Sequence, residues 1–363
     1  MNERWVAVLG SRDQPTDAVQ EYCANLGSTL ESQGINFGLL RVRWPEVGWS
    51  AALRELREKI IGGQQTWFLL QYTALAWSRR GISLRVLKVL RLLKKNGARC
   101  AIVFHDTEAF SGDRIADRAR RIIQLYTMRQ TVRIADMTVL TVPAEKISWL
   151  PKDAKNVMFI PVGANLPAPE KVWSSRRNSV ERTPTVAVFS VTGGAPGREE
   201  IKLIVAAVRY AAERIGKLRL SVLGRNSETA GKTLQAQLVG VPAEVTIHGL
   251  LASEDVVRVL GDSDVLLFTR GPLSTRRGSA IAGIACGLPV VAAEGLETTA
   301  PITEAGVAFV PPGSTGEWGA TLLRVLSDNA YRASLSERSR AAQERYFSWG
   351  AIAKQYLQAL GKM

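Results

Sequence analysis

The residues with the clearest chemical potential lie in the stretch from Asp264 to Ala293 (DVLLFTRGPLSTRRGSAIAGIACGLPVVAA). An apolar run near its start predicts a buried strand, and the polar loop after it carries Arg276 and Arg277 directly before a helix that begins at Gly278 and Ser279. The free N–H groups of a helix N-terminus bind anions, and guanidinium groups add bidentate phosphate contacts. We therefore expect a phosphate or diphosphate site here, with a basic solvated loop before a core helix as the open alternative.

Two further polar pairs follow predicted strands of the first half. His105 and Asp106 come after the apolar run Ala101–Phe104, and Gly10 and Ser11 end the run that opens the chain. Ligands of open α/β sheets bind at the carboxyl ends of the strands, so these residues are candidates for substrate contact. The structural alternatives are a packed histidine with a capping aspartate, and an ordinary tight turn at the first strand.

The elements that must position these residues form an alternating pattern. Short apolar runs alternate with helix-period segments along the whole chain, which is typical of parallel sheets covered by helices. Predicted strands are Trp5–Leu9, Asn36–Arg41, Thr66–Gln71, Cys100–Phe104, Met137–Thr141, Val157–Ile160, Thr185–Ser190, Leu218–Leu223, Val245–His248, Val265–Phe268, Pro289–Ala292 and Gly306–Phe309. Predicted helices run from Thr16 or Asp17 to Ser32 and over Ser50–Ile61, Leu84–Asn96, Arg114–Arg133, Glu199–Arg214, Glu317–Ser327, Ala330–Tyr346 and Gly350–Leu360.

A change of composition divides this pattern into two halves. Between Asn165 and Pro184 the chain is rich in Pro, Ser and charge without apolar periodicity, which predicts a linker over residues 168–184. The expected architecture is two Rossmann-like α/β domains, 1–167 and 185–345, that face each other across a cleft. The carboxyl ends of both sheets would line that cleft, where such folds bind ligands.

Bulk composition narrows the class of protein. The 363 residues are 46% hydrophobic and 22% charged, as in globular proteins, and no window offers the roughly 18 uncharged apolar residues of a transmembrane helix. The first residues lack the pattern of a secretory signal, and Cys23, Cys100 and Cys286 stand far apart. We expect reduced thiols in a cytoplasmic protein. With His105 and His248 as the only histidines, a His-rich metal site is not expected.

Several motifs resemble the retaining family 4 glycosyltransferases, which have the GT-B fold. The turn Ala285–Val291 (ACGLPVV) matches the family's donor-binding segment, and Thr246–Leu250 and Asp262–Val265 resemble its preceding steps. Phe347–Trp349 and the segment after it resemble the closing helix, so residues 346–363 would return to the first domain. Val103–Asp106 stands where the family carries its strand-end histidine. The likeness covers most of the second half and, more loosely, the first.

The resemblance implies a retaining, metal-independent transfer of a sugar from a nucleotide-diphosphate sugar to a lipid-linked or glycan acceptor. The donor would bind the second domain and the acceptor the first, on the side of Gly10 and Ser11, with no further cofactor. His105 would contact the donor sugar, and Asp106 would orient the loop or the acceptor. Stabilisation of the leaving diphosphate is a largely electrostatic task that needs no pair of carboxylates.

The chain departs from the family in its donor segment. Ser274 and Ala282 occupy the positions of the family's two glutamates, which face the sugar and the ribose. The family's basic pair is altered as well. The diphosphate contacts would instead come from Gly193, Gly194, Arg198, Arg225, Arg276, Arg277, Gly278 and Ser279. His248, Gly249 and Leu250 would lie at the wall of the nucleotide pocket.

The charge is uneven and basic. The net charge is +14, and residues 77–133 hold 14 Lys/Arg against 4 Asp/Glu. In Leu84–Lys95 (LRVLKVLRLLKK) the cations recur along one helical face and leucines fill the rest, which fits an anionic membrane surface; a solvated helix face is the plain alternative. Nucleic acid is not favoured, because no recognition motif accompanies the charge.

Two rival functions share the fold. A catalytically inactive nucleotide-binding relative would explain Ser274 and Ala282, and it would bind nucleotide without consuming donor. A nucleotide-sugar epimerase or hydrolase would need acidic residues placed for acid–base work, and it would turn over without an acceptor. The sequence leaves open the donor sugar, its base (uridine or guanosine) and the oligomeric state.

Overall fold

The computed structural model describes residues 4–61, 66–112, 114–173, 182–311, 313–314 and 316–361. The chain forms two compact α/β units, which we call unit 1 (Met1–Pro161 with Trp349–Met363) and unit 2 (Val162–Ser348). The expected linker 168–184 falls inside unit 2, and its residues 174–181 lie outside the described part.

Unit 1 is built on a parallel sheet of six strands in the order β2-β1-β3-β4-β5-β6. The strands are β1 (Arg4–Leu9), β2 (Asn36–Arg41), β3 (Trp67–Tyr72), β4 (Arg99–Phe104), β5 (Met137–Leu140) and β6 (Val157–Phe159). All six residues of β3 are buried, since a central strand of a parallel sheet is covered on both faces. The continuous apolar runs of the sequence are explained by this burial.

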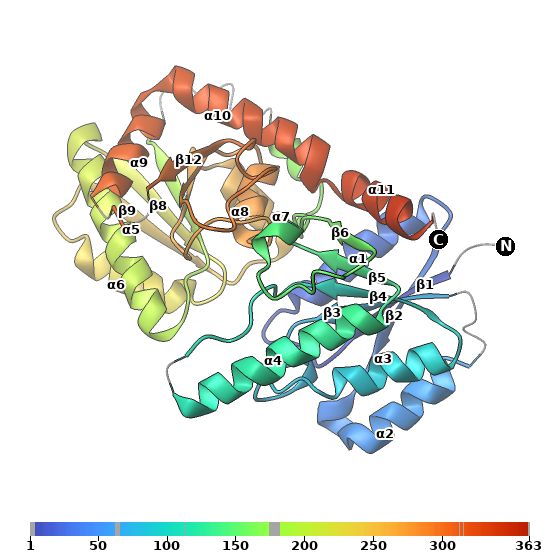
Figure 1. Cartoon of the computed structure of the whole chain (residues 1–363). Helices are drawn as coiled ribbons and strands as arrows, with labels where there is room; N and C mark the ends of the chain where they lie inside the picture. The colour runs from blue at the N-terminus through green and yellow to red at the C-terminus, as the bar shows by residue number, and fades with distance from the viewer. Residues whose placement is uncertain are drawn as a thin grey trace. The chain divides into compact units, whose positions relative to one another are not determined.

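Helices cover both faces of the first sheet. They are α1 (Ala18–Glu31), α2 (Trp44–Lys59), α3 (Val86–Lys95), α4 (Ile115–Ile134) and the last helix α11 (Trp349–Leu360). α1 and α11 pack together on one face, and α2, α3 and α4 follow one another across the other (Figure 1). The return of α11 to the first unit agrees with the sequence prediction.

One helix differs from its predicted bounds for a local reason. The expected start at Ser50 lies beyond the observed start of α2, because Trp44 and Pro45 already form a helical turn. Gly48, with φ 77° and ψ 161°, then breaks the helix, and the main body of α2 resumes after it. The predicted helix therefore corresponds to the second, longer piece.

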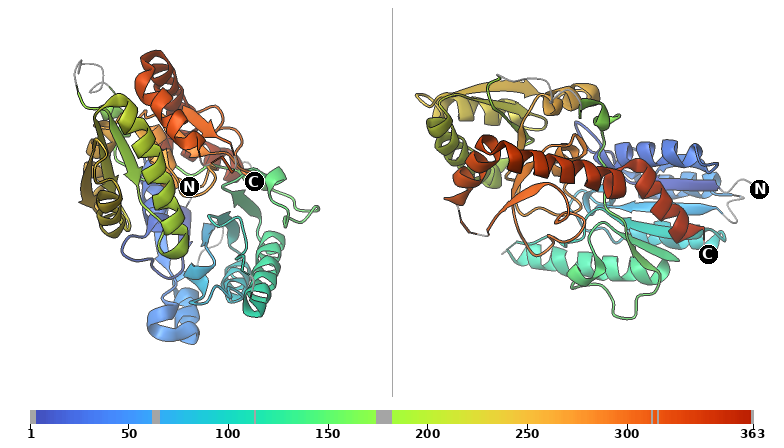
Figure 2. Two further views of the ribbon diagram at one scale, coloured as in Figure 1. Left: turned by 90° about the vertical axis from the view of Figure 1, so that its left-hand side faces the viewer. Right: turned by 90° about the horizontal axis from the view of Figure 1, so that it is seen from above.

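Unit 2 has the Rossmann strand order. Its sheet is parallel, with the order β12-β11-β10-β7-β8-β9. The strands are β7 (Thr185–Phe189), β8 (Leu218–Leu223), β9 (Ala243–Gly249), β10 (Val265–Phe268), β11 (Val290–Ala293) and β12 (Val307–Val310). The helices are α5 (Gly194–Ile215), α6 (Ser227–Gln237), α7 (Ser253–Gly261), α8 (Gly278–Ala285), α9 (Glu317–Ser327) and α10 (Asn329–Ala342). Figure 2 shows α5 lying across one face of this sheet.

Each sheet has one point where the strand order reverses. In unit 1 it lies between β1 and β3, and in unit 2 between β7 and β10. The loops that leave neighbouring strands at such a point turn to opposite faces and open a crevice, which is where α/β sheets bind ligands. These two places are where the candidate residues must be sought.

Candidate functional site

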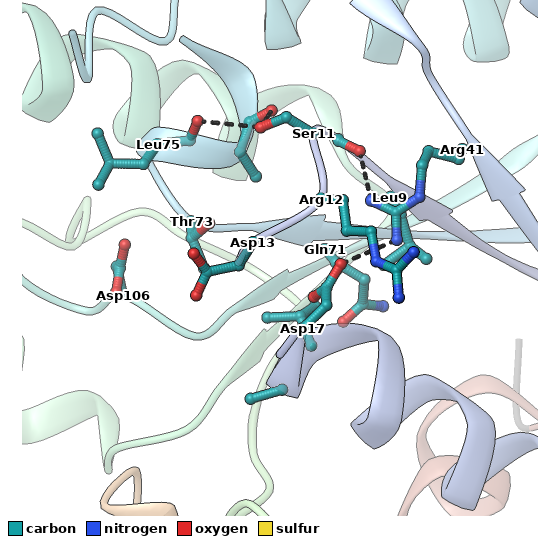
Figure 3. Close-up of a pocket in the computed structure, with 14 residues that line it drawn as sticks. Leu9, Ser11, Arg12, Asp13, Asp17, Arg41, Gln71, Thr73, Leu75 and Asp106 are labelled. Atoms are coloured by element: carbon teal, nitrogen blue, oxygen red, sulfur yellow. Dashed lines mark hydrogen bonds and ion pairs between the residues drawn. The ribbon is translucent and has the colours of Figure 1, made fainter. Parts of the chain in front are cut away.

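A cavity of about 350 Å³ opens in unit 1 at the switch point between β1 and β3. It is walled by the loop after β1, the start of α1 and the loop after β3 (Figure 3). Its polar side chains are those of Ser11, Arg12, Asp13, Asp17, Arg41, Gln71, Thr73 and Asp106. Carboxylates, amides and hydroxyls with one or two guanidinium groups suit a ligand that is rich in hydroxyl groups.

The loop after β1 is fixed by contact with the loop after β3. A Cβ at Gly10 would lie 2.3 Å from the carbonyl oxygen of Ala76, so only glycine permits this approach. Ser11 donates its backbone N–H to the same carbonyl at 2.7 Å, and its Oγ donates to it at 3.1 Å. Gly10 and Ser11 therefore form a tight turn, and this turn is part of the cavity wall.

Arg41 holds the opposite wall. Its Nη1 donates to the Gly10 carbonyl at 2.8 Å, and its Nη2 donates to Asp17 Oδ2 at 2.9 Å and to Gln20 Oε1 at 2.7 Å. Asp17 also caps α1 by accepting the backbone N–H of Gln20. The Asp17 carboxylate therefore has a fixed place before any ligand arrives.

His105 lies behind the cavity rather than in its wall. Its Nε2 is 2.8 Å from Oε1 of Gln71, a cavity residue, and its ring meets the edge of Tyr22 at 5.0 Å between centroids. Burial lowers the pKa of His105 to about 4, although the negative charge of Asp17 acts in the other direction. The imidazole is therefore neutral near pH 7.

Asp106 does reach the cavity. One of its oxygens, Oδ2, accepts the backbone N–H of Ala74 at 3.2 Å, which ties the loop after β4 to the loop after β3. The two neighbours at the end of β4 thus differ in place: Asp106 borders the cavity, and His105 acts on it through Gln71.

In unit 2 the loop after β7 has the geometry of a Rossmann anion loop. A Cβ at Gly197 would lie 1.8 Å from the carbonyl oxygen of Thr192, so the loop can fold back on α5 only with glycine there. Gly193 precedes α5, and Gly194 opens it with a φ of 71°. Arg198 is exposed in the next turn.

The neighbouring loops after β7 and β8 are joined by backbone contacts. Ser190 Oγ accepts the N–H of Arg225 at 3.1 Å, and Val191 donates its N–H to the carbonyl of Arg225 at 3.1 Å. Arg225 is thereby held beside the β7 loop, as a phosphate contact at this place would require.

Arg270, which is not among the predicted phosphate-binding residues, also lies in this region. It follows β10 at the switch point, and its Nη1 is 3.5 Å from Oγ of Ser279 in the first turn of α8. Burial lowers its pKa; the carboxylate of Glu200 opposes that shift, and the positive charge of Arg225 adds to it. Its Nε is buried, with no hydrogen-bond partner among the described residues. Three groups thus converge: Arg225, Arg270 and the start of α8.

Arg276 and Arg277 have different surroundings. Arg276 Nε donates to Glu297 Oε2 at 2.9 Å, and the two side chains are 15% and 16% exposed. Arg277 is the N-cap residue of α8, and its Nη2 lies near Gly271 in the preceding loop. Gly278 and Ser279 form the first turn of α8 as predicted.

The predicted wall residues lie at one edge of the second sheet. His248 is half-buried in the edge strand β9, and burial lowers its pKa, with a smaller contribution from the charge of Arg258. Gly249 accepts the N–H of Gly224 at 2.7 Å, just before Arg225, while Leu250 is 51% exposed.

The two positions that the resemblance aligns with glutamates are both buried. Ser274 is 1% exposed in the loop before α8, and Ala282 is 3% exposed inside that helix. Among the residues that the structure describes, no group of three or more His, Cys, Asp or Glu is placed to hold a metal ion.

Comparison with known proteins agrees with this geometry. The model of the family described as "Glycosyl transferases group 1" matches residues 186–328, which include the whole switch point of unit 2. No curated protein matches the chain in sequence.

Solved structures match the entire chain at low sequence identity. A sucrose-phosphate synthase from Thermosynechococcus elongatus is 18% identical, with a TM-score of 0.70 over 99% of both chains. HepE from Anabaena, solved with UDP and glucose, is 14% identical, with a TM-score of 0.66 over 100% of both. A glycosyltransferase from Rickettsia africae is 12% identical, with a TM-score of 0.65 over 99% of this chain and 98% of that one. The predicted GT-B fold is confirmed.

Proposed function

We propose that this protein is a glycosyltransferase that takes its sugar from a nucleotide-diphosphate donor bound by unit 2. The observation that carries the proposal is the convergence of Arg225 and Arg270 with the first turn of α8, inside the stretch that matches the family model. HepE, a structural neighbour, was solved with UDP and with UDP-glucose, which supports a donor of this kind.

The donor would be held chiefly through its diphosphate. The guanidinium of Arg270 is partly desolvated and lies near the positive charge of Arg225. A bound phosphate would offset both the desolvation and the repulsion between the two cations. Arg277, Gly278, Ser279 and the glycine loop Gly193-Gly194 would add contacts at two helix N-termini. As the glycosidic bond to the diphosphate breaks, negative charge grows on the leaving group, and fixed cations stabilise that charge.

The acceptor would occupy the cavity of unit 1. Asp13, Asp17 and Asp106 can accept hydrogen bonds from sugar hydroxyls, and Arg41 keeps Asp17 in place. Neutral His105 would orient Gln71 and help position the donor sugar or the acceptor; it would not act as a cation. In this proposal the transfer retains the anomeric configuration and uses no metal.

The proposed setting is the cytoplasmic face of a membrane, with a lipid-linked or growing glycan as acceptor. The support is the basic region 77–133. The described part of the chain contains no helix long and apolar enough to cross a bilayer.

Nucleotide binding provides the test. Isothermal titration with UDP, GDP and their glucose esters should reveal micromolar or tighter binding of one base. Arg270→Gln and Arg225→Gln should each weaken the nucleoside diphosphate at least tenfold, because each removes a charge-assisted contact. Lys217→Gln is the matched control, since Lys217 lies exposed at the opposite end of β8. Unchanged affinity in both arginine variants would refute the site.

Turnover needs a separate measurement. Release of nucleoside diphosphate from the preferred donor should depend on an added glycan or lipid-linked acceptor, and Asp106→Asn should slow it without weakening the diphosphate. Tight nucleotide binding with no donor consumption under any acceptor would instead support the inactive relative.

A further inference from the structure

The first turns of α4 expose apolar side chains that a water-facing helix would not carry. Ile115 is 87% exposed, Ile122 is 67% exposed and Tyr126 is 51% exposed. The spacing of seven and then four residues puts all three on one face of α4, opposite the buried side chains Gln124, Thr127 and Met128. Scattered single apolar residues need no explanation, but three aligned on one helical face form a surface.

Arginines border this apolar face. Arg118 and Arg121 are exposed in the same turns, and Arg129 and Arg133 continue the row toward the end of α4. Asp117 is the one acidic residue of the helix, and it pairs with Arg120 at 3.8 Å. The face is therefore cationic as well as apolar.

Two loops extend the surface beyond α4. The buried side chain of Gln124 donates to the Gly81 carbonyl at 2.8 Å and accepts the Phe110 N–H at 2.6 Å, which fastens both loops to the helix. These loops expose more apolar side chains, namely Leu75 at 67%, Ile82 at 41%, Leu84 at 40% and Phe110 at 42%. Arg79 and Arg80 are exposed among them.

The neighbouring helix α3 contributes charge alone. Its apolar residues Val86, Leu87, Val89, Leu90 and Leu93 are all buried in the core of unit 1. The leucines within α3 are therefore not available for insertion into a bilayer. The cations Arg85, Lys88 and Arg91 are exposed instead. The apolar contribution, which the sequence placed on α3, comes from α4 and the two loops.

We propose that the α4 face and its two loops (the docking surface: residues 75–84, 110 and 115–133) bind an anionic lipid bilayer. Ile115, Ile122 and Tyr126 would enter the interface between headgroups and acyl chains, while the arginines contact lipid phosphates. Charge complementarity favours a bilayer over a second copy of this chain, since two copies would bring the same cations together.

The docking surface adjoins the cavity of unit 1. Leu75 lines that cavity, and it also lies within 3.9 Å of where a Cβ on Gly81 would be. The N-terminal end of α4 projects past the end of its sheet (Figures 1 and 2). This inference rests on the proposed function, because it identifies the face that would meet the membrane holding the acceptor. A lipid-linked acceptor could then pass from the bilayer into the cavity without leaving the protein surface.

Vesicle co-sedimentation tests the proposal with the full chain. The protein should bind vesicles of phosphatidylglycerol and phosphatidylcholine, bind phosphatidylcholine alone at least tenfold more weakly, and lose affinity as salt rises. Ile115→Gln/Ile122→Gln should lower the affinity at least tenfold and keep the salt dependence. Arg118→Gln/Arg121→Gln should lower the affinity by a similar factor and flatten that dependence. Both pairs are exposed, so the fold should persist.

Val239→Gln is the matched control, because Val239 is 79% exposed in unit 2. It should bind vesicles as the unmodified protein does. Absence of binding to phosphatidylglycerol vesicles, or full binding by the double isoleucine variant, would overturn the proposal. So would a dimer that the isoleucine variant dissociates, because a second copy would then cover the face. Nucleotide titration of the same variants should be unchanged, which separates this outcome from a failure of the donor site.

Discussion

His105 makes the stability of unit 1 depend on pH in a direction that can be measured. Burial lowers its pKa from an ordinary 6.5 to about 4, so the native protein keeps it neutral where the unfolded chain would protonate it. Between these two values the unfolded state binds more protons, and the free energy of unfolding therefore falls as the pH falls. The contribution is small at pH 7 and amounts to a loss of about 2 kcal/mol by pH 5.

The substitution His105→Gln removes the titratable imidazole and keeps a side chain that can form a hydrogen bond with Gln71. Urea unfolding of both proteins at pH 7 and pH 5 should show that the variant loses about 2 kcal/mol less than the unmodified protein over this interval. Tryptophan fluorescence suits the measurement, because most of the nine tryptophans lie in unit 1. Equal losses in the two proteins would refute the assignment.

The imidazole signals give an independent check. The chain has two histidines, so a proton NMR titration follows two sets of ring signals, and His248→Gln identifies those of His105. These signals should show a midpoint near pH 4. A midpoint near 6.5 would mean that His105 is solvated, and its placement behind Gln71 would then be wrong.

Three shorter predictions follow from single contacts. Glu297→Gln should tighten nucleoside diphosphate binding a fewfold in calorimetry, because it frees Arg276 from its carboxylate partner; no change would mean that Arg276 takes no part. Gly197→Ala should destabilise unit 2 by about 3 kcal/mol, since its Cβ meets a backbone oxygen. Gly350→Ala, with open space around it in α11, should instead keep or slightly raise the stability in the same melting experiment. Tyr22→Phe should lower the stability of unit 1 by about 1 kcal/mol, through the buried 3.0 Å hydrogen bond to Tyr356; if Tyr356→Phe adds the same loss again in the double variant, the bond is not shared.

Local signals were enough to predict the elements of the fold. The predicted run Leu218–Leu223 is β8, and α1 is capped by Asp17, one of the two residues at which the sequence placed the helix start. These features depend on apolar periodicity and on side chains close in sequence, both of which can be read from one chain. The place of the binding crevices could not be read in this way, since strand order depends on contacts between distant segments.

The candidate site shows the same division. Gly278 and Ser279 begin α8 as predicted, because a helix start is a local property. The surroundings of each arginine depend on distant segments. Arg276 meets Glu297 from the loop after β11, and Arg270 meets the charges of Glu200 in α5 and of Arg225 in the loop after β8. One signal for Arg270 was present in the sequence, since it follows the strand β10 with only Thr269 between them.

The contrast between these arginines concerns the net gain that each would have from binding phosphate. A guanidinium that already has a carboxylate partner must give up that contact to bind phosphate, so its net gain is small. A desolvated guanidinium with an unpaired buried Nε has already lost its water and gains a partner when an anion arrives. Burial and the charge of Arg225, which lower the pKa of Arg270, thus make the charged guanidinium unfavourable in the folded protein, and a bound diphosphate would remove this unfavourable free energy. A diphosphate bound at Arg270 would therefore stabilise the folded unit 2 against unfolding, and the stabilisation would grow with its affinity.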